Sequence, residues 1–405
     1  MAQRLSLKIT SSRRVTSEFS SPVILVKLNH IDILGAGPAG LYTAILLKIN
    51  QPSCDVQVTD QNGEDDTFGF GVVFSDRALD FLKTDDPDTH ALITPRMQHW
   101  QDMTLSVMGE QITLDGIGFS AIGRLTLLKI FQQRALDLGV RLVFDEKVGS
   151  DSLREFEDRS DLIIGADGLN SLVRQSNETG FEMTKDLFSN HFAWFGTDLV
   201  FDNLTQTFVR SSIGALNAHH YRYSENMSTF IVECDHKSFI DHGFSEMDEY
   251  SSAGFCSKVF ADTLDGHSLI TNQSHWRQFP RLWCNNWAQD KKVIIGDAAH
   301  TAHFSIGSGT RLALEDSIAL VGALNRFDDL SNALSDFQEN RQPIVEKIVK
   351  AANTSAVWYE DFSQKMELPL PQFAFDYLSR SGRVDLERLR QISPGFVSQY
   401  EQFTG

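Results

Sequence analysis

The segment that decides the fold is HIDILGAGPAGLYTAILLKIN, residues 30–50. It reads as a short apolar strand, a glycine turn and then an apolar-periodic helix. Gly35, Gly37 and Gly40 have the spacing G-x-G-x-x-G. In this motif the first glycine permits a tight turn, the second lets a pyrophosphate approach the backbone, and the third lets the helix pack on the strand. The pattern predicts a phosphate site at the helix N-terminus, where free N–H groups favour anions.

A second apolar run, CDVQVTDQN at residues 54–62, follows the helix and reads as a strand that ends at Asp60. An acidic residue at that place can accept hydrogen bonds from ribose hydroxyls. Strand, helix, second strand and terminal acid together predict a dinucleotide site, but they do not indicate which dinucleotide.

Two further loops follow buried strands. DLIIGADGLNSLVR, residues 161–174, carries Asp167 and Gly168 after its strand, and a plain turn with a capping Asp or Ser is the alternative interpretation. GDAAHTAHFSIGSGT, residues 296–310, carries Asp297 and then opens a helix. The N–H groups of that helix could stabilise negative charge. Either loop alone could be structural.

The three loops, in this order and spacing, resemble the p-hydroxybenzoate hydroxylase-like (group A) FAD-dependent aromatic monooxygenases over roughly residues 30–360. The resemblance implies that FAD is the cofactor, with NADH or NADPH as co-substrate. It implies that the pyrophosphate is held by Gly35, Gly37, Pro38, Ala39 and Gly40, and the adenosine ribose by Asp60.

The same resemblance assigns further cofactor residues. Arg124, which opens a helix after Ile-Gly, would contact FAD, and Asp167 with Gly168 would serve both FAD and NAD(P)H. Asp297 would hold the ribityl chain. The helix start would face the pyrimidine edge of the flavin through Gly307, Gly309 and Thr310.

A narrower branch is indicated by HFSIGSGT, ALEDSIAL and GFGVVFSDRALDFL. These stretches are similar to the flavin hydroxylases of aromatic CoA thioesters such as salicylyl-CoA and 2-aminobenzoyl-CoA. The resemblance implies that NAD(P)H reduces FAD, that O2 forms a C4a-hydroperoxide, and that an electron-rich ring takes the terminal oxygen. The alternatives are a free indole, tryptophan-derived or phenolic acid substrate in secondary metabolism, and a non-hydroxylating flavoprotein.

Candidate substrate residues follow from the motifs. His303 and Phe304 occupy two positions where many family members carry proline, which would put His303 beside the flavin. His303 is the candidate catalytic base, and a residue that only shapes the pocket is the competing interpretation. Alternation places Tyr221 and Tyr223 on one face of a strand, where they would bind substrate or pack in the core. No metal site with credible ligand spacing is expected.

The expected fold class is α/β, with a discontinuous Rossmann-like FAD-binding domain and an inserted, mostly antiparallel β-sheet substrate domain. The FAD-binding domain is placed at residues 28–76, 106–180 and 285–360. The substrate domain is placed at 77–105 and 181–284, a helical C-terminal segment at 361–405, and a flexible tail at 1–27.

Charge and composition narrow the partners. The net charge of −18 argues against a nucleic-acid surface, which needs clustered Lys and Arg. A CoA thioester would need cations for its phosphates. Arg77, Arg96, Arg210 and Arg222 are available, and solvated surface charge is the alternative interpretation for each of them. A small aromatic substrate and O2 are the expected partners. The segment VWYEDFSQKM at 357–366 could be a homodimer contact, and packing within the chain is the alternative.

No apolar run approaches the roughly 20 residues of a membrane-spanning helix. The four cysteines are scattered and suit reduced thiols in a cytoplasmic protein. The first 20 residues are basic, and organelle import through them is the alternative to a disordered tail.

Overall fold

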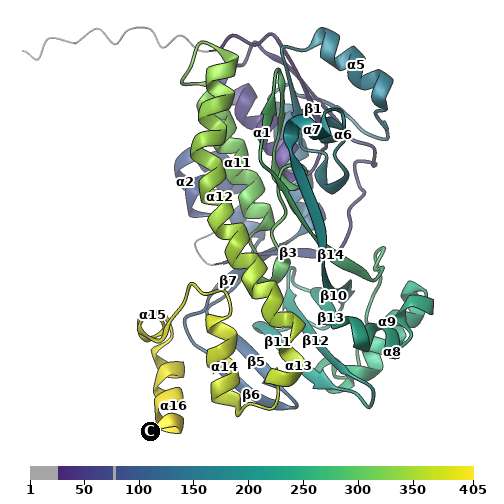
Figure 1. Ribbon diagram of the computed structural model, residues 1–405, viewed down its shortest axis with the longest axis vertical. Helices are drawn as coiled ribbons and strands as arrows, with labels where there is room; N and C mark the ends of the chain where they lie inside the picture. The colour runs from purple at the N-terminus through teal and green to yellow at the C-terminus, as the bar shows by residue number, and fades with distance from the viewer. Residues whose placement is uncertain (1–25, 76–78) are drawn as a thin grey trace, which may run out of the picture.

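The computed structural model describes residues 26–75 and 79–405. Figure 1 shows a lobe built on a parallel sheet at one end and a lobe built on an antiparallel sheet at the other, with the long helix α12 (Leu330–Glu360) running along both. The α/β class with an antiparallel substrate lobe and a helical C-terminal segment is confirmed. The predicted tail lies outside the described residues except for Val26 and Lys27.

The first lobe contains a six-stranded sheet that is parallel except for its edge strand β15. Its order is β15 (Ala288–Gln289), β16 (Lys292–Ile294), β9 (Leu162–Gly165), β1 (His30–Leu34), β2 (Asp55–Thr59), β8 (Arg141–Val143). The central strands β1 and β9 are almost entirely buried, which explains why they are mainly apolar. The exception is the buried Asp32 of β1, whose carboxylate pairs with Arg159 at 2.6 Å. Helix α1 (Pro38–Asn50) packs against α11 (Gly309–Leu324) and α4 (Arg124–Asp137).

The second lobe contains a seven-stranded sheet in which only β11 and β5 pair in parallel. Its order is β14 (Arg277–Cys284), β10 (Met183–Thr197), β13 (Ser228–Cys234), β12 (Ala215–Arg222), β11 (Leu204–Arg210), β5 (Met103–Val107), β6 (Glu110–Leu114). The domain boundary expected at residue 106 therefore falls inside β5, and β6 also belongs to this sheet. Sequence order did not reveal this, because β5 joins the sheet next to a strand about 100 residues later in the chain.

A three-stranded sheet connects the two lobes. It consists of β3 (Gly71–Ser75), β7 (Phe119–Gly123) and β4 (Gln98–Trp100), and the short helices α2 (Asp80–Asp85) and α3 (Pro87–Ile93) lie in the chain between β3 and β4.

Three helices interrupt the region that was expected to be mostly antiparallel sheet. They are α8 (His236–Asp241), α9 (Glu249–Val259) and α10 (Ala261–Leu264). Asp235 caps α8 by accepting from the Ser238 N–H, and Asp248 caps α9 by accepting from the Ser251 N–H. An Asp three residues before a Ser is the sequence signal that would have indicated both helix starts.

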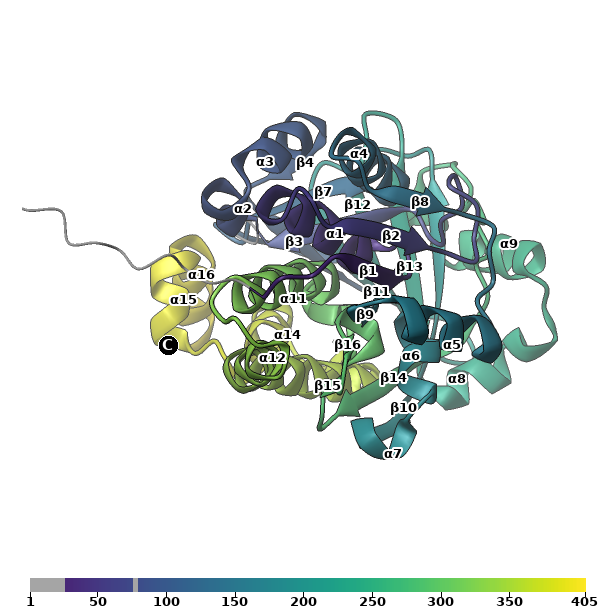
Figure 2. The same cartoon turned by 90° about the horizontal axis from the view of Figure 1, so that it is seen from above.

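The C-terminal segment is packed against the antiparallel lobe. It forms α13 (Phe362–Lys365), α14 (Leu370–Ser379), α15 (Leu386–Ile392) and α16 (Pro394–Thr404). In Figure 2, α15 and α16 lie on the side of the molecule opposite α9. Asp115, which follows β6, accepts from the backbone N–H groups of Gly395 and Phe396 and so holds the start of α16. Trp358 and Phe362 are buried within the chain, and the homodimer contact at 357–366 stays a prediction. Within the described ranges, none of the helices is long and apolar enough to cross a bilayer.

Candidate active site

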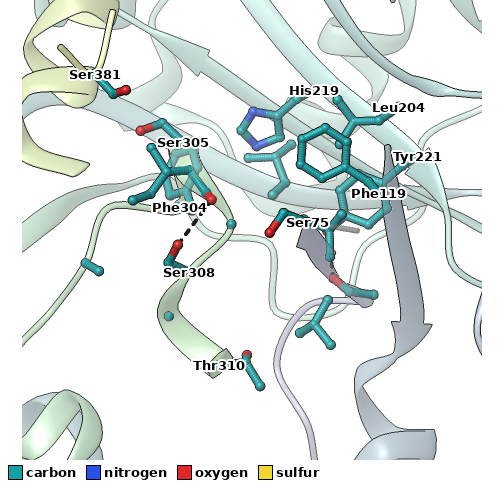
Figure 3. A pocket seen from close by; sticks show the side chains of 18 of the residues that line it. Ser75, Phe119, Leu204, His219, Tyr221, Phe304, Ser305, Ser308, Thr310 and Ser381 are labelled. Atoms are coloured by element: carbon teal, nitrogen blue, oxygen red, sulfur yellow. Dashed lines mark hydrogen bonds between the residues drawn. The ribbon is translucent and has the colours of Figure 1, made fainter. Parts of the chain in front are cut away.

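A cavity of about 570 Å³ lies where the two lobes and the C-terminal helices meet. Its wall includes residues from all three loops singled out in the sequence, namely Gly37, Pro38, Ala39, Gly168, Asp297, Gly307, Gly309 and Thr310, together with Arg124. Figure 3 shows the substrate-lobe side of this cavity, with the start of α11 on one side and the antiparallel sheet on the other. The loops are far apart in sequence, and the parallel sheet brings them together at one edge.

The first glycine loop has two packed glycines and one open glycine. Gly35 has a φ of +101°, and a Cβ there would lie 2.2 Å from the Ala166 carbonyl oxygen. A Cβ at Gly40 would lie 1.9 Å from the carbonyl oxygen of Gly35, so this glycine allows the helix to pack closely. Gly37 has no atom within 4 Å of such a Cβ and lines the cavity. The open position is therefore the one at which a ligand can touch the backbone.

Asp60 directly follows β2, as predicted, but it does not line the cavity. Its carboxylate accepts from the Ala36 N–H at 2.6 Å and from the Asn62 N–H at 2.8 Å. In this structure Asp60 therefore braces the glycine loop through the Ala36 N–H.

The Asp167 carboxylate binds the start of a helix and also carries an oxygen without a partner in the described chain. One carboxylate oxygen accepts from the Leu172 N–H at 2.6 Å, at the start of α6 (Leu172–Gln175). The other oxygen is buried without a partner in the described part of the chain. Burial raises the pKa of this carboxyl, against the hydrogen bonds it accepts. Its neighbour Gly168 lines the cavity, so this loop connects β9 to α6 and also forms part of the cavity wall.

Asp297 and Arg124 place opposite charges on the cavity wall. Asp297 lies deep within the molecule, yet its side chain is open to the cavity. Burial raises the pKa of Asp297, opposed by His300 and Arg124. Burial likewise lowers the pKa of Arg124, opposed by Asp297. The Nε of Arg124 is buried and finds no hydrogen-bond acceptor among the residues described.

The turn that presents Asp297 is held by a buried network on α11. Asp316 accepts from the Gly296 N–H at 3.0 Å, and its carboxylate lies 2.8 Å from the His300 Nε2 and from the Arg341 Nε. Burial raises the pKa of Asp316, but His300 and Arg341 together bring it below the ordinary value. His300 is thereby a structural residue of the loop.

The start of α11 faces the cavity. Gly307 has a φ of +60°, a left-handed conformation that glycine adopts most readily. Gly309 is the first residue of the helix, and nothing lies within 4 Å of a Cβ built on it. Free N–H groups at this helix start favour a negatively charged or oxygen-rich ligand.

The sheet forms the opposite wall. Tyr221 lines the cavity, and its hydroxyl donates to the Gly71 carbonyl at 2.9 Å. Tyr223 does not line the cavity. It packs against Gly71 so closely that a Cβ added to Gly71 would lie 2.3 Å from the Cβ of Tyr223. Phe304 lines the cavity as expected.

His303, the expected base, is not part of the cavity wall. Its ring packs edge-on against Phe188 and Phe279, and its Nδ1 accepts from the Ser305 N–H at 3.3 Å. Burial lowers its pKa to about 3. The motif fixed the loop correctly, but the turn at Phe304–Ile306 presents Phe304 to the cavity and turns His303 away from it.

Among the polar residues that line the cavity and that sequence reasoning missed are His219, Gln206 and Arg380. The alternation that placed Tyr221 on the sheet face also places His219 there, so a signal for it existed. Arg380 follows α14, and no pattern in the sequence connects that segment to the loops.

The arginines considered for CoA phosphates do not converge on the cavity. Arg210 pairs with Glu367, Arg96 donates to the Leu92 carbonyl, and Arg222 donates to the His99 carbonyl. Arg77 lies outside the described residues.

The cavity suits a flavin dinucleotide. Gly37 and Gly309 leave room for a ligand against backbone, Asp297 offers a free carboxylate for hydroxyl groups, and Arg124 has an unused donor. A parallel sheet with ligand loops at its carboxyl edge is typical of a dinucleotide-binding protein, and here an antiparallel sheet covers the site.

Comparison with known proteins identifies the family of the chain. The chain belongs to the FAD binding domain family, whose model matches residues 146–352. It is 39% identical over 360 residues to salicyloyl-CoA 5-hydroxylase of a Streptomyces species, covering 86% of this chain and 69% of that protein. It is 31% identical to 3-hydroxy-4-methyl-anthranilyl-[aryl-carrier protein] 5-monooxygenase of Streptosporangium sibiricum, covering 90% and 97%.

The fold is shared with solved structures. The crystal structure of 2-methyl-3-hydroxypyridine-5-carboxylic acid oxygenase superposes with a TM-score of 0.67 at 17% identity, covering 88% of this chain and 96% of that one. The resemblance drawn from the three loops is thereby confirmed. The chain is an NAD(P)H-dependent flavoprotein monooxygenase with FAD as its cofactor.

Proposed function

We propose that this monooxygenase hydroxylates an electron-rich aromatic ring carried as an acyl thioester, most simply an aromatic acyl-CoA such as salicylyl-CoA. The names of two relatives support this substrate class, since one acts on a CoA thioester and the other on an aryl-carrier protein. Both carriers attach the acyl group through the same kind of pantetheine arm.

The observation that carries the proposal is the shape of the cavity. Beyond the flavin loops it continues between the antiparallel sheet and the C-terminal helices. The residues of this extension are mainly apolar: Met103, Ile117, Leu378, Val384, Leu389 and Ile392. A free single-ring acid would leave this extension empty, whereas a thioester arm would fill it with partly apolar chain.

The cofactor residues take the roles that the family resemblance implies. We propose that the open backbone at Gly37 meets the pyrophosphate, that Arg124 and Asp297 bind polar groups of FAD, and that the α11 N-terminus faces the flavin ring. Asp60, Asp167 and Gly168 support the cofactor from the flanking loops. Bound FAD supplies the redox chemistry, taking electrons from NAD(P)H and activating O2. The sheet wall and Phe304 orient the ring and exclude water from it.

A second candidate is a free aromatic or indolic acid, and Arg380 favours it. Its guanidinium lines the cavity and donates to the Ser305 carbonyl at 2.9 Å and to the Tyr377 carbonyl at 2.6 Å. Within residues 26–75 and 79–405 it makes no ion pair with a carboxylate. An unpaired cation on the wall could meet a free carboxylate in the substrate.

The experiment compares both candidates on the purified holoenzyme. NADH and NADPH oxidation are measured with salicylyl-CoA, 2-aminobenzoyl-CoA, and the corresponding free acids, and products are analysed by mass for one added oxygen atom. Faster oxidation and an oxygenated product with the thioesters alone would support the proposal. Oxygenation of the free acids alone would move the assignment to the second candidate.

A further inference from the structure

The cavity wall contains a histidine and a glutamine directly opposite one another on adjacent strands. Gln206 of β11 and His219 of β12 pair with each other in the antiparallel ladder. Their side chains therefore project from the same face of the sheet and are neighbours. Both line the cavity, and the His219 ring points into it in Figure 3.

The His219 ring is free of protein hydrogen bonds over the described part of the chain. It meets the edge of Phe304, with ring centres 5.1 Å apart, and contacts no protein acceptor or donor through its nitrogens. Burial lowers the pKa of His219 to about 3, and the charge of Arg380 acts in the same direction. At neutral pH the ring is therefore uncharged and offers one acceptor nitrogen and one N–H to the cavity.

Gln206 complements it with a donor. The carbonyl oxygen of its side chain accepts from the Tyr359 hydroxyl at 3.3 Å, which fixes the orientation of the amide. Its NH₂ group then remains available on the cavity side. A neutral acceptor and an amide donor thus stand side by side on an otherwise largely aromatic and apolar wall.

We propose that His219 accepts a hydrogen bond from a hydroxyl or amino group on the substrate ring, while Gln206 donates to the neighbouring acyl carbonyl. This inference rests on the proposed function and narrows the substrate to aromatic acyl groups that carry such a donor next to the carbonyl. The hydrogen bond orients the ring. It also raises the electron density of the ring, because the imidazole draws the hydrogen of the hydroxyl or amino group away from its oxygen or nitrogen.

The same surroundings decide how far the proton moves. A proton placed on His219 would create a second cation in a buried site near Arg380, so the ring donor keeps its proton and the contact stays a hydrogen bond. His219 therefore positions the substrate by accepting a hydrogen bond and does not take the proton from it.

The test compares two thioesters that differ only at the ring donor. Salicylyl-CoA and benzoyl-CoA are titrated into the oxidised holoenzyme, and binding is followed by the change in flavin absorbance. One net hydrogen bond predicts that wild-type protein binds salicylyl-CoA about five- to tenfold more tightly. In His219→Phe this preference falls to about onefold, with benzoyl-CoA affinity unchanged within about twofold. His219→Gln, which keeps an acceptor, restores part of the preference.

Turnover provides a second readout. In His219→Phe, the oxygenated product formed per NAD(P)H consumed falls and H2O2 rises, because a ring without its anchor is held in the wrong orientation. The matched control is His220→Asn. His220 is also buried, but its Nε2 bonds the Thr207 hydroxyl at 2.9 Å and its ring stacks on Phe230, away from the cavity. This control leaves the substrate preference unchanged.

Two outcomes would overturn the inference. An equal loss of affinity for both thioesters in His219→Phe would reduce His219 to a structural residue, and an unchanged preference would show that it does not meet the ring donor. If wild-type protein binds neither thioester but binds free acids, the thioester proposal fails separately. Salicylate and benzoate then give the same comparison for His219.

Discussion

Asp297 is the clearest residue-scale test of the cofactor site, because its carboxylate faces the cavity without a hydrogen-bond partner in the described chain. Asp297→Ala removes an acceptor for FAD hydroxyl groups. Hydrogen bonds to a charged group contribute about 1.5–3 kcal/mol, so FAD should bind roughly 10- to 150-fold more weakly. The flavin-to-protein ratio after purification and a fluorescence titration of apoprotein with FAD measure the change.

The control for this substitution is Asp290→Asn. Asp290 is an exposed acid in the turn between β15 and β16, at a φ of +53°, which asparagine tolerates. It should bind FAD like wild type. If Asp297→Ala also keeps full FAD affinity, Asp297 has no contact with the cofactor.

Glu233 gives a residue-scale prediction of stability against pH. Burial raises its pKa to about 8, with Asn190 opposing and the negative charge of Glu360 adding to the shift. The folded state therefore retains this proton between the ordinary value of 4.5 and about 8, while the unfolded chain has lost it. The contribution of Glu233 to the free energy of unfolding consequently falls by about 1.4 kcal/mol for each pH unit through that window.

Glu233→Gln removes the titration and keeps an oxygen for the Asn190 amide, which donates to Glu233 at 2.8 Å. Between about pH 6 and pH 7.5 the wild type should lose about 2 kcal/mol of unfolding free energy that the variant keeps. Urea unfolding at both pH values measures the difference. Parallel curves for the two proteins would mean that Glu233 is ionised in the folded state.

At the scale of elements, the first and the last turn of α11 respond differently to added side chains. Gly309→Val places a branched side chain where nothing lies within 4 Å and where the flavin is proposed to sit. It should lower FAD content strongly without lowering the stability of the apoprotein. Gly322→Ala lies inside the same helix, where a Cβ meets only the flexible end of Arg326 at 3.3 Å.

Gly322→Ala should raise the unfolding free energy by about 0.5–1 kcal/mol and leave FAD binding unchanged, because alanine is the better helix former. Thermal unfolding of apo and holo forms measures both substitutions. Full FAD content in Gly309→Val would contradict the placement of the flavin at this helix end.

The elements that carry chemistry were the ones that sequence patterns predicted best. The turn at Gly35–Gly40, the helix opened by Arg124 and the helix opened after Gly307 all lie where the motifs put them, because glycine spacing and strand ends are local signals. The orientation of His303 was not predictable, since it depends on how one short 3₁₀ turn packs against Phe188 and Phe279.

At the scale of the molecule, long-range pairing was the part that no local pattern could reveal. β5 pairs with β11 across about 100 residues, and helices α14 and α15 close one side of the cavity. The helical character of residues 361–405 was predicted, but their place at the active site depends on tertiary contacts such as Asp115 with the start of α16.

The same closure by the C-terminal helices supports the last prediction, which concerns the length of the substrate. Val384, between α14 and α15, is half-buried and lines the apolar extension of the cavity. Val384→Trp should fill part of that extension. A thioester arm would then be obstructed while a small free acid would still fit beside the flavin. The KM for salicylyl-CoA should rise about tenfold, the effect of a loss of about 1.4 kcal/mol. Binding of salicylate and the FAD content should be unchanged.

Glu387→Trp is the matched control. Glu387 lies three residues after Val384, is exposed to solvent and does not line the cavity. Its ion pair with Arg390 is at the surface and contributes little to stability. Steady-state kinetics of both variants with the two substrates decide the matter. If Val384→Trp weakens salicylate and salicylyl-CoA equally, the extension does not hold the arm of the substrate, and the free acid becomes the better assignment for this cavity.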